Sequence, residues 1–276
     1  MEEVWHGAII YMSNKYYIII YIIYYMKVIS FCIYGSQQKY CIGLLENIEI
    51  IKNKLPDFYI FIYVGNGVPN DYIEKYSQYD KVRIFYTNVI GYNTRIHRFF
   101  AIDEDDVNVM IVRDCDSRIH NRDIWCILHF IQSKYYVHTI RDHPEHRSHI
   151  MAGLWGLKKG LLNRKLRDIY SLYNKNNIDF NEIQHDQSFL RDMLYNTFIK
   201  YMIIYVNNQN LRLTKNEIIC LIPFKIQDNE FCGQVIEYNK NNEAYIKYIV
   251  NESNTTTKTN YYGINNLSNM SNIFKN

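Results

Sequence analysis

The sequence lacks the cysteine spacings that mark zinc sites and disulfide frameworks. Its 276 residues include six cysteines, and no two of them are spaced as C-x-x-C. A structural zinc site or a disulfide-rich secreted fold would be expected to show such a pattern. Several of the cysteines stand inside apolar runs, which is typical of reduced thiols in a cytosolic protein. We therefore predict a cytoplasmic protein, with association at the periphery of a membrane as the alternative.

A strong charge of one sign is also missing. The formal net charge is +3, and the lysines and arginines are interspersed with acids. No basic stripe with interleaved aromatic residues is visible, so we expect no nucleic-acid partner. The sequence has no visible internal repeat, and its length and 48% hydrophobic content suit one large globular domain.

The two ends of the chain differ in composition from its middle. Residues 1–26 are an apolar extension, but the apolar run at residues 16–26 is well short of the about 20 residues that a membrane-spanning helix needs. No small-residue cleavage site follows this run, as a signal peptide would require. We expect a β-rich extension, or sequence upstream of a start at Met26, with a membrane anchor as the alternative. Residues 241–276 are polar and rich in Asn, Ser and Thr, and we expect a disordered tail there.

Between these ends, residues 27–240 alternate apolar runs with amphipathic segments. The expected strands are residues 27–34, 58–64, 81–87, 107–112 and 135–140. The expected helices are residues 37–55, 71–79, 95–103 and 121–132. Continuous apolar strands between helices indicate an α/β fold, with a mostly parallel central sheet covered by helices on both faces. A smaller mixed part follows residue 150, with helices near 161–174 and 182–195 and strands near 199–206 and 217–222.

Two aspartates follow the apolar strand at residues 107–112. Asp114 and Asp116 are two positions apart, so along an extended backbone their side chains point to the same face. Ligands bind beyond the carboxyl ends of strands in open α/β sheets, and paired carboxylates there suit Mg²⁺ or Mn²⁺ completed by phosphates and water. Arg113 and Arg118 flank the pair, and guanidinium groups match phosphate geometry. The pattern favours a metal–diphosphate site; the alternative is an acidic loop that is merely solvated or caps the next helix.

Further motifs agree with such a site. The sequences "RDCDSR", "RDHPEH", "AGLWG" and "HDQSFL" occur in this order, between an opening strand "KVISFCIYG" and a final "FCGQVIEY". The ordered set resembles a GT-A-fold, DXD-containing family of nucleotide-sugar glycosyltransferase-like proteins from bacteria and large DNA viruses. The pattern of that family is close to RDxDSR, MRDHP, GGMWG and DQ-FL. The resemblance implies a single GT-A-like domain over residues 27–240. It also implies transfer of a sugar from a nucleoside-diphosphate sugar to a hydroxyl acceptor on a glycan or protein.

The resemblance also implies roles for individual residues. Asp114 and Asp116 would hold Mn²⁺ or Mg²⁺, and Asp186 would be the catalytic carboxylate, with Asp142 as the alternate. The donor would be bound by Tyr34, Gly35, Arg98, Arg113, Ser117, Arg118 and Gln187. The sugar or the acceptor would be bound by Arg141, His143, Gly153, Trp155 and Gly156. Ordinary structural roles stand beside these: a surface helix for Arg98, a turn for Gly35, the core for Trp155 and a helix N-terminus for Asp186.

One departure from the family pattern weakens the expectation of full activity. Enzymes of this fold often take a further metal ligand, commonly histidine, from their C-terminal part, and no histidine follows His185 here. The matching position is Tyr205 or Asn207, neither of which is a strong substitute. Two alternatives therefore stay open. One is a nucleotide- or carbohydrate-binding relative that has lost turnover, and the other is a metal-dependent phosphohydrolase or nuclease.

Overall fold

The computed structural model describes residues 8–13, 16–21, 26–174, 185–207, 212–224 and 230–246. Of the tail expected over residues 241–276, residues 247–276 lie outside the described residues. Within the described residues, no helix is both long and apolar enough to cross a membrane. All six cysteines are described, and each is a free thiol.

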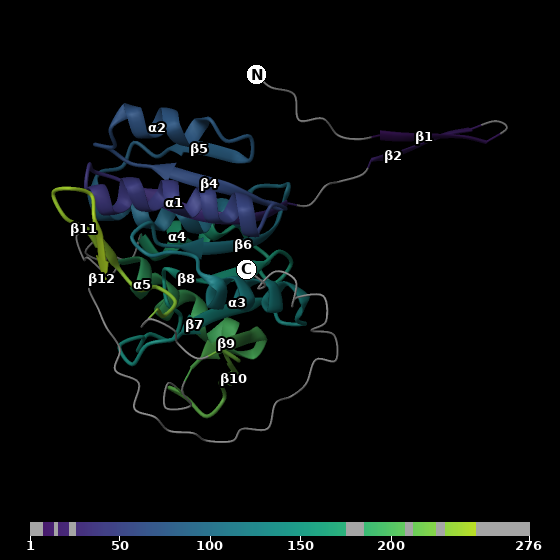
Figure 1. Ribbon diagram of the computed structural model, residues 1–276. Helices are drawn as coiled ribbons and strands as arrows, with labels where there is room; N and C mark the ends of the chain where they lie inside the picture. The colour runs from purple at the N-terminus through teal and green to yellow at the C-terminus, as the bar shows by residue number, and fades with distance from the viewer. Residues whose placement is uncertain are drawn as a thin grey trace.

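The centre of the molecule is an eight-stranded sheet of order β10-β9-β7-β8-β6-β3-β4-β5 (Figure 1). Its strands are β3 (Met26–Ile33), β4 (Phe58–Val64), β5 (Val82–Tyr86), β6 (Val107–Arg113), β7 (Val137–Arg141), β8 (Leu154–Lys158), β9 (Met202–Val206) and β10 (Ile218–Leu221). Only β8 runs antiparallel to its two neighbours, β6 and β7. All other neighbouring pairs in this sheet are parallel, so the predicted mostly parallel sheet is confirmed.

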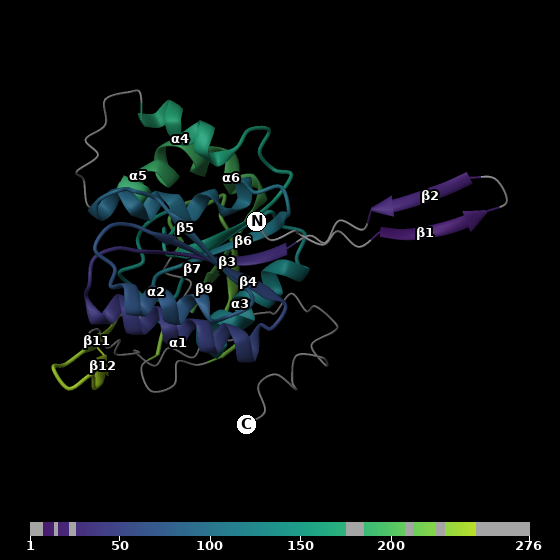
Figure 2. The ribbon, with the colours of Figure 1, turned by 90° about the horizontal axis from the view of Figure 1, so that it is seen from above.

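Helices cover both faces of the sheet, as predicted (Figure 2). One face carries α1 (Gln38–Lys54), α2 (Asn70–Ser77) and α3 (Asn121–Gln132). The other face carries the 3₁₀ helix η1 (Gly91–Asp103), α4 (Leu166–Asn174), α5 (His185–Phe189) and α6 (Tyr195–Phe198). The π-helical turn η2 (Leu190–Leu194) joins α5 to α6, and the 3₁₀ turn η3 (Ile199–Tyr201) follows α6. Alternate residues of the buried strands enter two separate apolar clusters, one on each face. In β3, for example, Ile29 and Phe31 pack with α1, whereas Val28 packs with η1.

Two elements differ from the sequence expectations. The helix expected at residues 95–103 is the second part of the longer 3₁₀ helix η1. Strand β8 was not expected, because the glycines of "AGLWG" suggested a loop. This strand needs a glycine at position 156, because a Cβ there would lie 2.7 Å from the side chain of Ile111 and 2.8 Å from that of His138. The side chains of the neighbouring strands fill this space.

Two small hairpins complete the described chain. In the apolar extension, β1 (Ala8–Ser13) pairs antiparallel with β2 (Tyr16–Tyr21). Near the C-terminus, β11 (Ile236–Tyr238) pairs antiparallel with β12 (Ala244–Ile246), so this hairpin crosses residue 240, where the tail was expected to begin. It lies beside the start of α1 (Figure 1), where Lys39 pairs with Glu237 at 3.3 Å.

Candidate active site

A cleft of about 450 Å³ opens beyond the carboxyl ends of β3 and β6. It gathers side chains from both sides of the sheet: the turn after β3, the loop after β6, the helix η1, the loop before β8 and the start of α5. Seven of the residues expected at the site line it, namely Tyr34, Arg98, Asp114, Asp116, Gly153, Asp186 and Gln187.

The loop that carries the two aspartates is tightly fixed by its backbone. The Cys115 thiol donates to the carbonyl of Cys32 at 3.2 Å, and the amide of Ile236 donates to the carbonyl of Asp116 at 2.8 Å. Helix α1 packs so closely against the loop that a Cβ at Gly43 would lie 2.1 Å from the Cys115 carbonyl oxygen. The loop after β6 therefore presents its acidic side chains from a rigid base.

Arg98 of η1 connects two carboxylates that come from different elements. Its Nη1 donates to Oδ1 of Asp114, and its Nη2 donates to Oδ2 of Asp186 at 2.9 Å. The side chain of Arg98 is 3% exposed, whereas that of Asp114 is 46% exposed and that of Asp186 is 6% exposed. Asp186 also accepts from the backbone amide of Gln187 at 2.9 Å, which fixes the direction of its carboxylate.

The two aspartates of the pair titrate differently. Desolvation in the cleft opposes ionisation of Asp114, but the charge and hydrogen bond of Arg98 outweigh it, so the pKa of Asp114 lies below its ordinary value. Burial and the negative charge of Asp114 raise the pKa of Asp116 to about 6. Positive charge close to Asp116 is therefore favoured, as a cation site requires.

The chemistry of the donor set fits a hard divalent cation. Two carboxylates on one loop suit Mg²⁺ or Mn²⁺, which usually keep water and phosphate oxygens as their other ligands. A Cβ at Gly153 would lie 1.8 Å from Oδ2 of Asp114, so this glycine leaves the space that the carboxylate occupies. In the part of the chain that the structure describes, no group of three His, Cys, Asp or Glu side chains could hold a metal.

The two positions expected to replace the missing histidine do not reach the cleft. Tyr205 is fully buried, and its hydroxyl bonds to Nδ1 of His129 at 2.7 Å. Asn207 donates to the backbone carbonyl of Asp142 at 3.1 Å. Neither side chain lines the cleft, so a cation there would take its remaining ligands from elsewhere.

Arg95 lines the cleft and was not expected at the site. Its Nε donates to the hydroxyl of Tyr34 at 3.0 Å, and its guanidinium lies 4.8 Å from the ring centre of Tyr92. The signal in the sequence was its spacing of three from Arg98, which places both side chains on one face of a 3₁₀ helix. Gly35, next to Tyr34, has a φ of +69° and serves the turn that ends β3.

The "RDHP" motif lies outside the cleft and forms buried ion pairs. The carboxylate of Asp142 is fully buried, binds the guanidinium of Arg122 with both oxygens and accepts from the amide of Cys232 at 3.0 Å. Arg141, also fully buried, makes two bonds of 2.9 Å with Glu217. These positions do not fit a catalytic Asp142 or a sugar-binding Arg141, because neither group faces the cleft.

Three further residues of the "RDCDSR" motif hold its loop in place. Arg113 is buried and bonds to Asp123 at the start of α3, at 2.6 Å from its Nη2. Ser117 is 4% exposed and donates to the carbonyl of Asp114 at 3.4 Å. Arg118 binds Glu46 and the hydroxyl of Tyr238. None of the three lines the cleft, so their contacts support the acidic loop from behind.

The remaining expected residues are mostly structural in their contacts. Trp155 is fully buried in β8 and packs edge-to-face on Phe99 at 5.0 Å, with Gly156 beside it in the same strand. His143 stacks on Phe231 at 4.4 Å and does not line the cleft. Gln187 does line it, but its amide bridges the carbonyl of Ile150 and the amide of Ala152, which positions the loop before β8.

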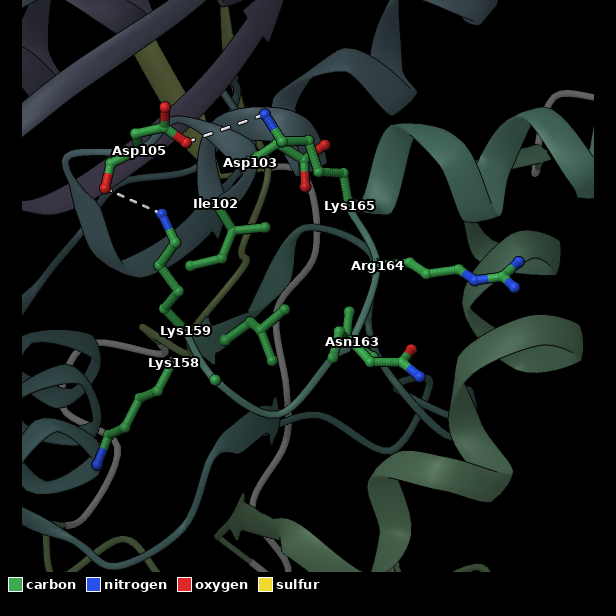
Figure 3. A pocket seen from close by; sticks show the side chains of 11 residues that line it. Ile102, Asp103, Asp105, Lys158, Lys159, Asn163, Arg164 and Lys165 are labelled. Carbon is green, nitrogen blue, oxygen red and sulfur yellow. Dashed lines mark hydrogen bonds and ion pairs between the residues drawn. The ribbon is translucent and has the colours of Figure 1, made fainter.

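A second hollow, of about 220 Å³, lies near the start of β6 and the end of β8 (Figure 3). Its cations are bound within the loops: Lys159 donates to the carbonyls of Glu104 and Asp105, at 2.7 and 3.0 Å, and Lys165 pairs with Asp105 at 4.0 Å. The side chain of Arg164 points away from the hollow (Figure 3). This region therefore offers no convergent set of groups for a ligand.

No model of a protein family matches the chain, and no curated protein matches its sequence. Several solved structures are similar to it in fold. A glycosyltransferase involved in the glycosylation of the major capsid of PBCV-1 is 14% identical over 66% of this chain and 82% of that chain, with a TM-score of 0.44. The galactosyltransferase LgtC, in complex with donor and acceptor sugar analogs, is 12% identical over 66% and 74%, with a TM-score of 0.45.

The mannosyltransferase PcManGT from Pyrobaculum calidifontis, solved with GDP-Man and Mn²⁺, is 9% identical over 71% of this chain and 56% of that chain, with a TM-score of 0.44. A 4-diphosphocytidyl-2C-methyl-D-erythritol synthase from Anaerococcus prevotii is similar too.

Proposed function

We propose that the protein is a metal-dependent glycosyltransferase that moves a sugar from a nucleoside-diphosphate sugar to a hydroxyl acceptor on a glycan or a protein. One observation carries the proposal: Asp114 and Asp116 lie in one cleft with Arg98 and Asp186, beyond the carboxyl ends of parallel strands. Carboxylates and guanidinium groups in that place suit a diphosphate bound through a divalent cation. The motifs of the glycosyltransferase-like family agree with this chemistry.

The diphosphate of the donor would lie between the acidic pair and the arginines of η1. Asp114 and Asp116 would supply two ligands to Mn²⁺ or Mg²⁺, and phosphate oxygens and water would supply the others. When bound, the cation stabilises the negative charge that develops on the diphosphate leaving group. Arg95 and Arg98 would place further positive charge near the same phosphates, in a site from which water is partly excluded.

Asp186 is our candidate for the carboxylate beside the donor sugar. Arg98 and the amide of Gln187 hold it in one direction, and each carboxylate oxygen has lone pairs left for a further donor. A fixed carboxylate there would accept from a sugar hydroxyl or stabilise positive charge at the anomeric carbon as the bond to the diphosphate breaks. Gln187 would act through the loop before β8, whose backbone it holds.

A panel of nucleoside-diphosphate sugars, measured with and without Mn²⁺, tests the proposal. Release of nucleoside diphosphate from one donor, dependent on Mn²⁺ and abolished by EDTA, is the expected result. Asp116→Ala should remove both turnover and metal-dependent donor binding. Asp105→Ala, which changes a fully exposed aspartate far from the cleft, is the matched control and should leave both unchanged. Equal donor affinity in the wild type and Asp116→Ala would contradict the proposed site.

A binding protein without turnover is the second candidate function. The observation that favours it is that, among the described residues, no third His, Cys, Asp or Glu side chain joins the acidic pair. Titration calorimetry with nucleoside diphosphates and Mn²⁺ separates the two functions. Binding that needs Mn²⁺, together with no hydrolysis or transfer from any donor, supports the binding protein.

A further inference from the structure

Arg98 is placed to control when the acidic pair accepts a cation. We propose that Arg98 acts as the built-in counter-ion of Asp114, so that a divalent cation binds strongly only together with the donor's diphosphate. This inference rests on the proposed function and adds to it an order of assembly. It concerns a positioning residue, because Arg98 acts here through Asp114.

Arg98 already pairs with two carboxylates of the cleft. Its one positive charge is shared by Asp114, which follows β6, and Asp186, which lies at the start of α5. Of these two carboxylates, only that of Asp114 is substantially exposed to the cleft, while Asp186 and the guanidinium are almost completely covered. A cation that enters the cleft therefore meets a carboxylate that already has a partner.

Arg98 is buried and keeps its positive charge beside Asp114. A guanidinium does not lose its proton in proteins, and a charge that is 97% covered is poorly screened by salt. Its Nη1 also donates to the carbonyl of Arg113 at 3.3 Å, which holds the group against the end of β6. The guanidinium thus stays beside Asp114, and a divalent cation on that carboxylate would be repelled by it.

A diphosphate removes this repulsion. Its oxygens bring negative charge into the cleft, which offsets the repulsion between the cation and the guanidinium. The Arg98 side chain is covered by protein, its Nε included, so the diphosphate acts on it through charge rather than through direct contact. Cation and diphosphate then each raise the affinity of the site for the other by the same factor, as linkage requires.

Mn²⁺ binding to the full chain, measured by electron paramagnetic resonance of free Mn²⁺, tests the inference without any assay of turnover. For the wild type, we expect saturating UDP or GDP to tighten Mn²⁺ binding by about tenfold or more, after allowance for the Mn²⁺–nucleotide complex. Arg98→Gln should bind Mn²⁺ alone about tenfold more tightly than the wild type, and the gain from nucleotide should largely disappear. Arg83→Gln removes an arginine that pairs with Asp106 outside the cleft, so it is the matched control and should behave as the wild type.

The outcomes separate this inference from the proposed function. Wild-type protein that binds Mn²⁺ alone as tightly as it does with nucleotide overturns the role of Arg98 and leaves the metal–diphosphate site standing. Wild-type protein that binds no Mn²⁺ under either condition overturns the proposed function itself. A gain from nucleotide that is unchanged in Arg98→Gln also overturns the role of Arg98, because phosphate oxygens alone would then account for it. If Arg98→Gln fails to fold, a wild-type Mn²⁺ affinity that does not change with nucleotide still overturns the inference.

Discussion

The carboxylate of Asp114 occupies the space that a side chain at position 153 would need. A Cβ built on Gly153 would come within 1.8 Å of Oδ2 and 2.5 Å of Cγ of Asp114. These two residues lie in different loops, one after β6 and one before β8. Because Gly153 has no side chain, the carboxylate of Asp114 can lie in its observed position.

Gly153→Ala should therefore displace the Asp114 carboxylate. We expect Mn²⁺-dependent binding of nucleoside diphosphate to weaken by about tenfold or more, and the free energy of unfolding to fall by about 1–3 kcal/mol through overpacking. Calorimetry and urea unfolding measure the two effects. Gly160→Ala is the control, because Gly160 has a φ of +99° and a Cβ there would meet only Tyr136, at an ordinary contact distance of 3.9 Å. It should lose stability through backbone strain and keep its nucleotide affinity.

The buried ion pair of Arg141 and Glu217 predicts a large loss of stability on single substitution. Glu217→Gln would leave the fully buried guanidinium of Arg141 without its counter-charge. We expect the free energy of unfolding to fall by about 3–5 kcal/mol. Asp71→Asn breaks the exposed pair with Lys75 and is the control, with an expected change below about 1 kcal/mol in urea unfolding. Similar losses in both variants would contradict the assignment.

His146 predicts a loss of stability in mild acid. Burial, with a smaller contribution from the nearby charge of His143, lowers the pKa of His146 to about 3. The unfolded chain then binds more protons below a pH of about 6.5, so this contribution to stability is present at neutral pH and is lost as the pH falls from about 6.5 toward 3. The expected loss from this residue between pH 7.5 and pH 5 is about 2 kcal/mol.

His146→Asn tests that origin. The Nδ1 of His146 accepts from the amide of Asp142 at 3.1 Å, and an asparagine oxygen can take over this bond without titrating. The His143 and Phe231 rings that pack around it remain. Urea unfolding at several pH values should show a shallower fall in acid for the variant. Parallel curves for the variant and the wild type would assign the acid sensitivity to other groups.

A double substitution tests whether the buried pair of Arg141 and Glu217 is needed for ligand binding in the cleft. Arg141→Met with Glu217→Leu replaces the buried pair by apolar side chains of similar size, which is often neutral for stability. Because neither residue faces the cleft, Mn²⁺-dependent nucleotide binding should be retained within about threefold. A loss of binding in a stably folded variant would return the "RDHP" region to the ligand-binding set.

Seven of the eight strands of the sheet could be predicted, because each is a run of mostly apolar residues. Residues 58–64 and 121–132 were expected as a strand and a helix, and the structure has the same bounds. Strand β8 could not be predicted from its own residues, since its glycine is accepted only because side chains of β6 and β7 fill the space. Its place in the sheet depends on neighbours that a local pattern does not reveal.

The sequence predicted that the acidic pair would lie at the ligand-binding end of the sheet. It did not show which of the surrounding charged residues face the cleft and which form buried ion pairs. Arg98 and Arg141 each stand in a charged or apolar run that resembles a ligand-binding motif. The structure turns Arg98 to the cleft and Arg141 to Glu217, 76 residues further along the chain. Whether an arginine binds a ligand or forms a structural ion pair depends on such a distant partner. The residues next to the arginine in the sequence do not identify that partner.

The segment from Phe231 to Tyr238 reaches back to the middle of the chain, where Ile236 holds the acidic loop and Cys232 holds Asp142. During synthesis these residues leave the ribosome long after the strands that carry the aspartates. The nascent chain can thus assemble most of its sheet before the loop of Asp114 and Asp116 has all of its supports. Under the proposed function, the site for the diphosphate would be completed last, when this late segment docks.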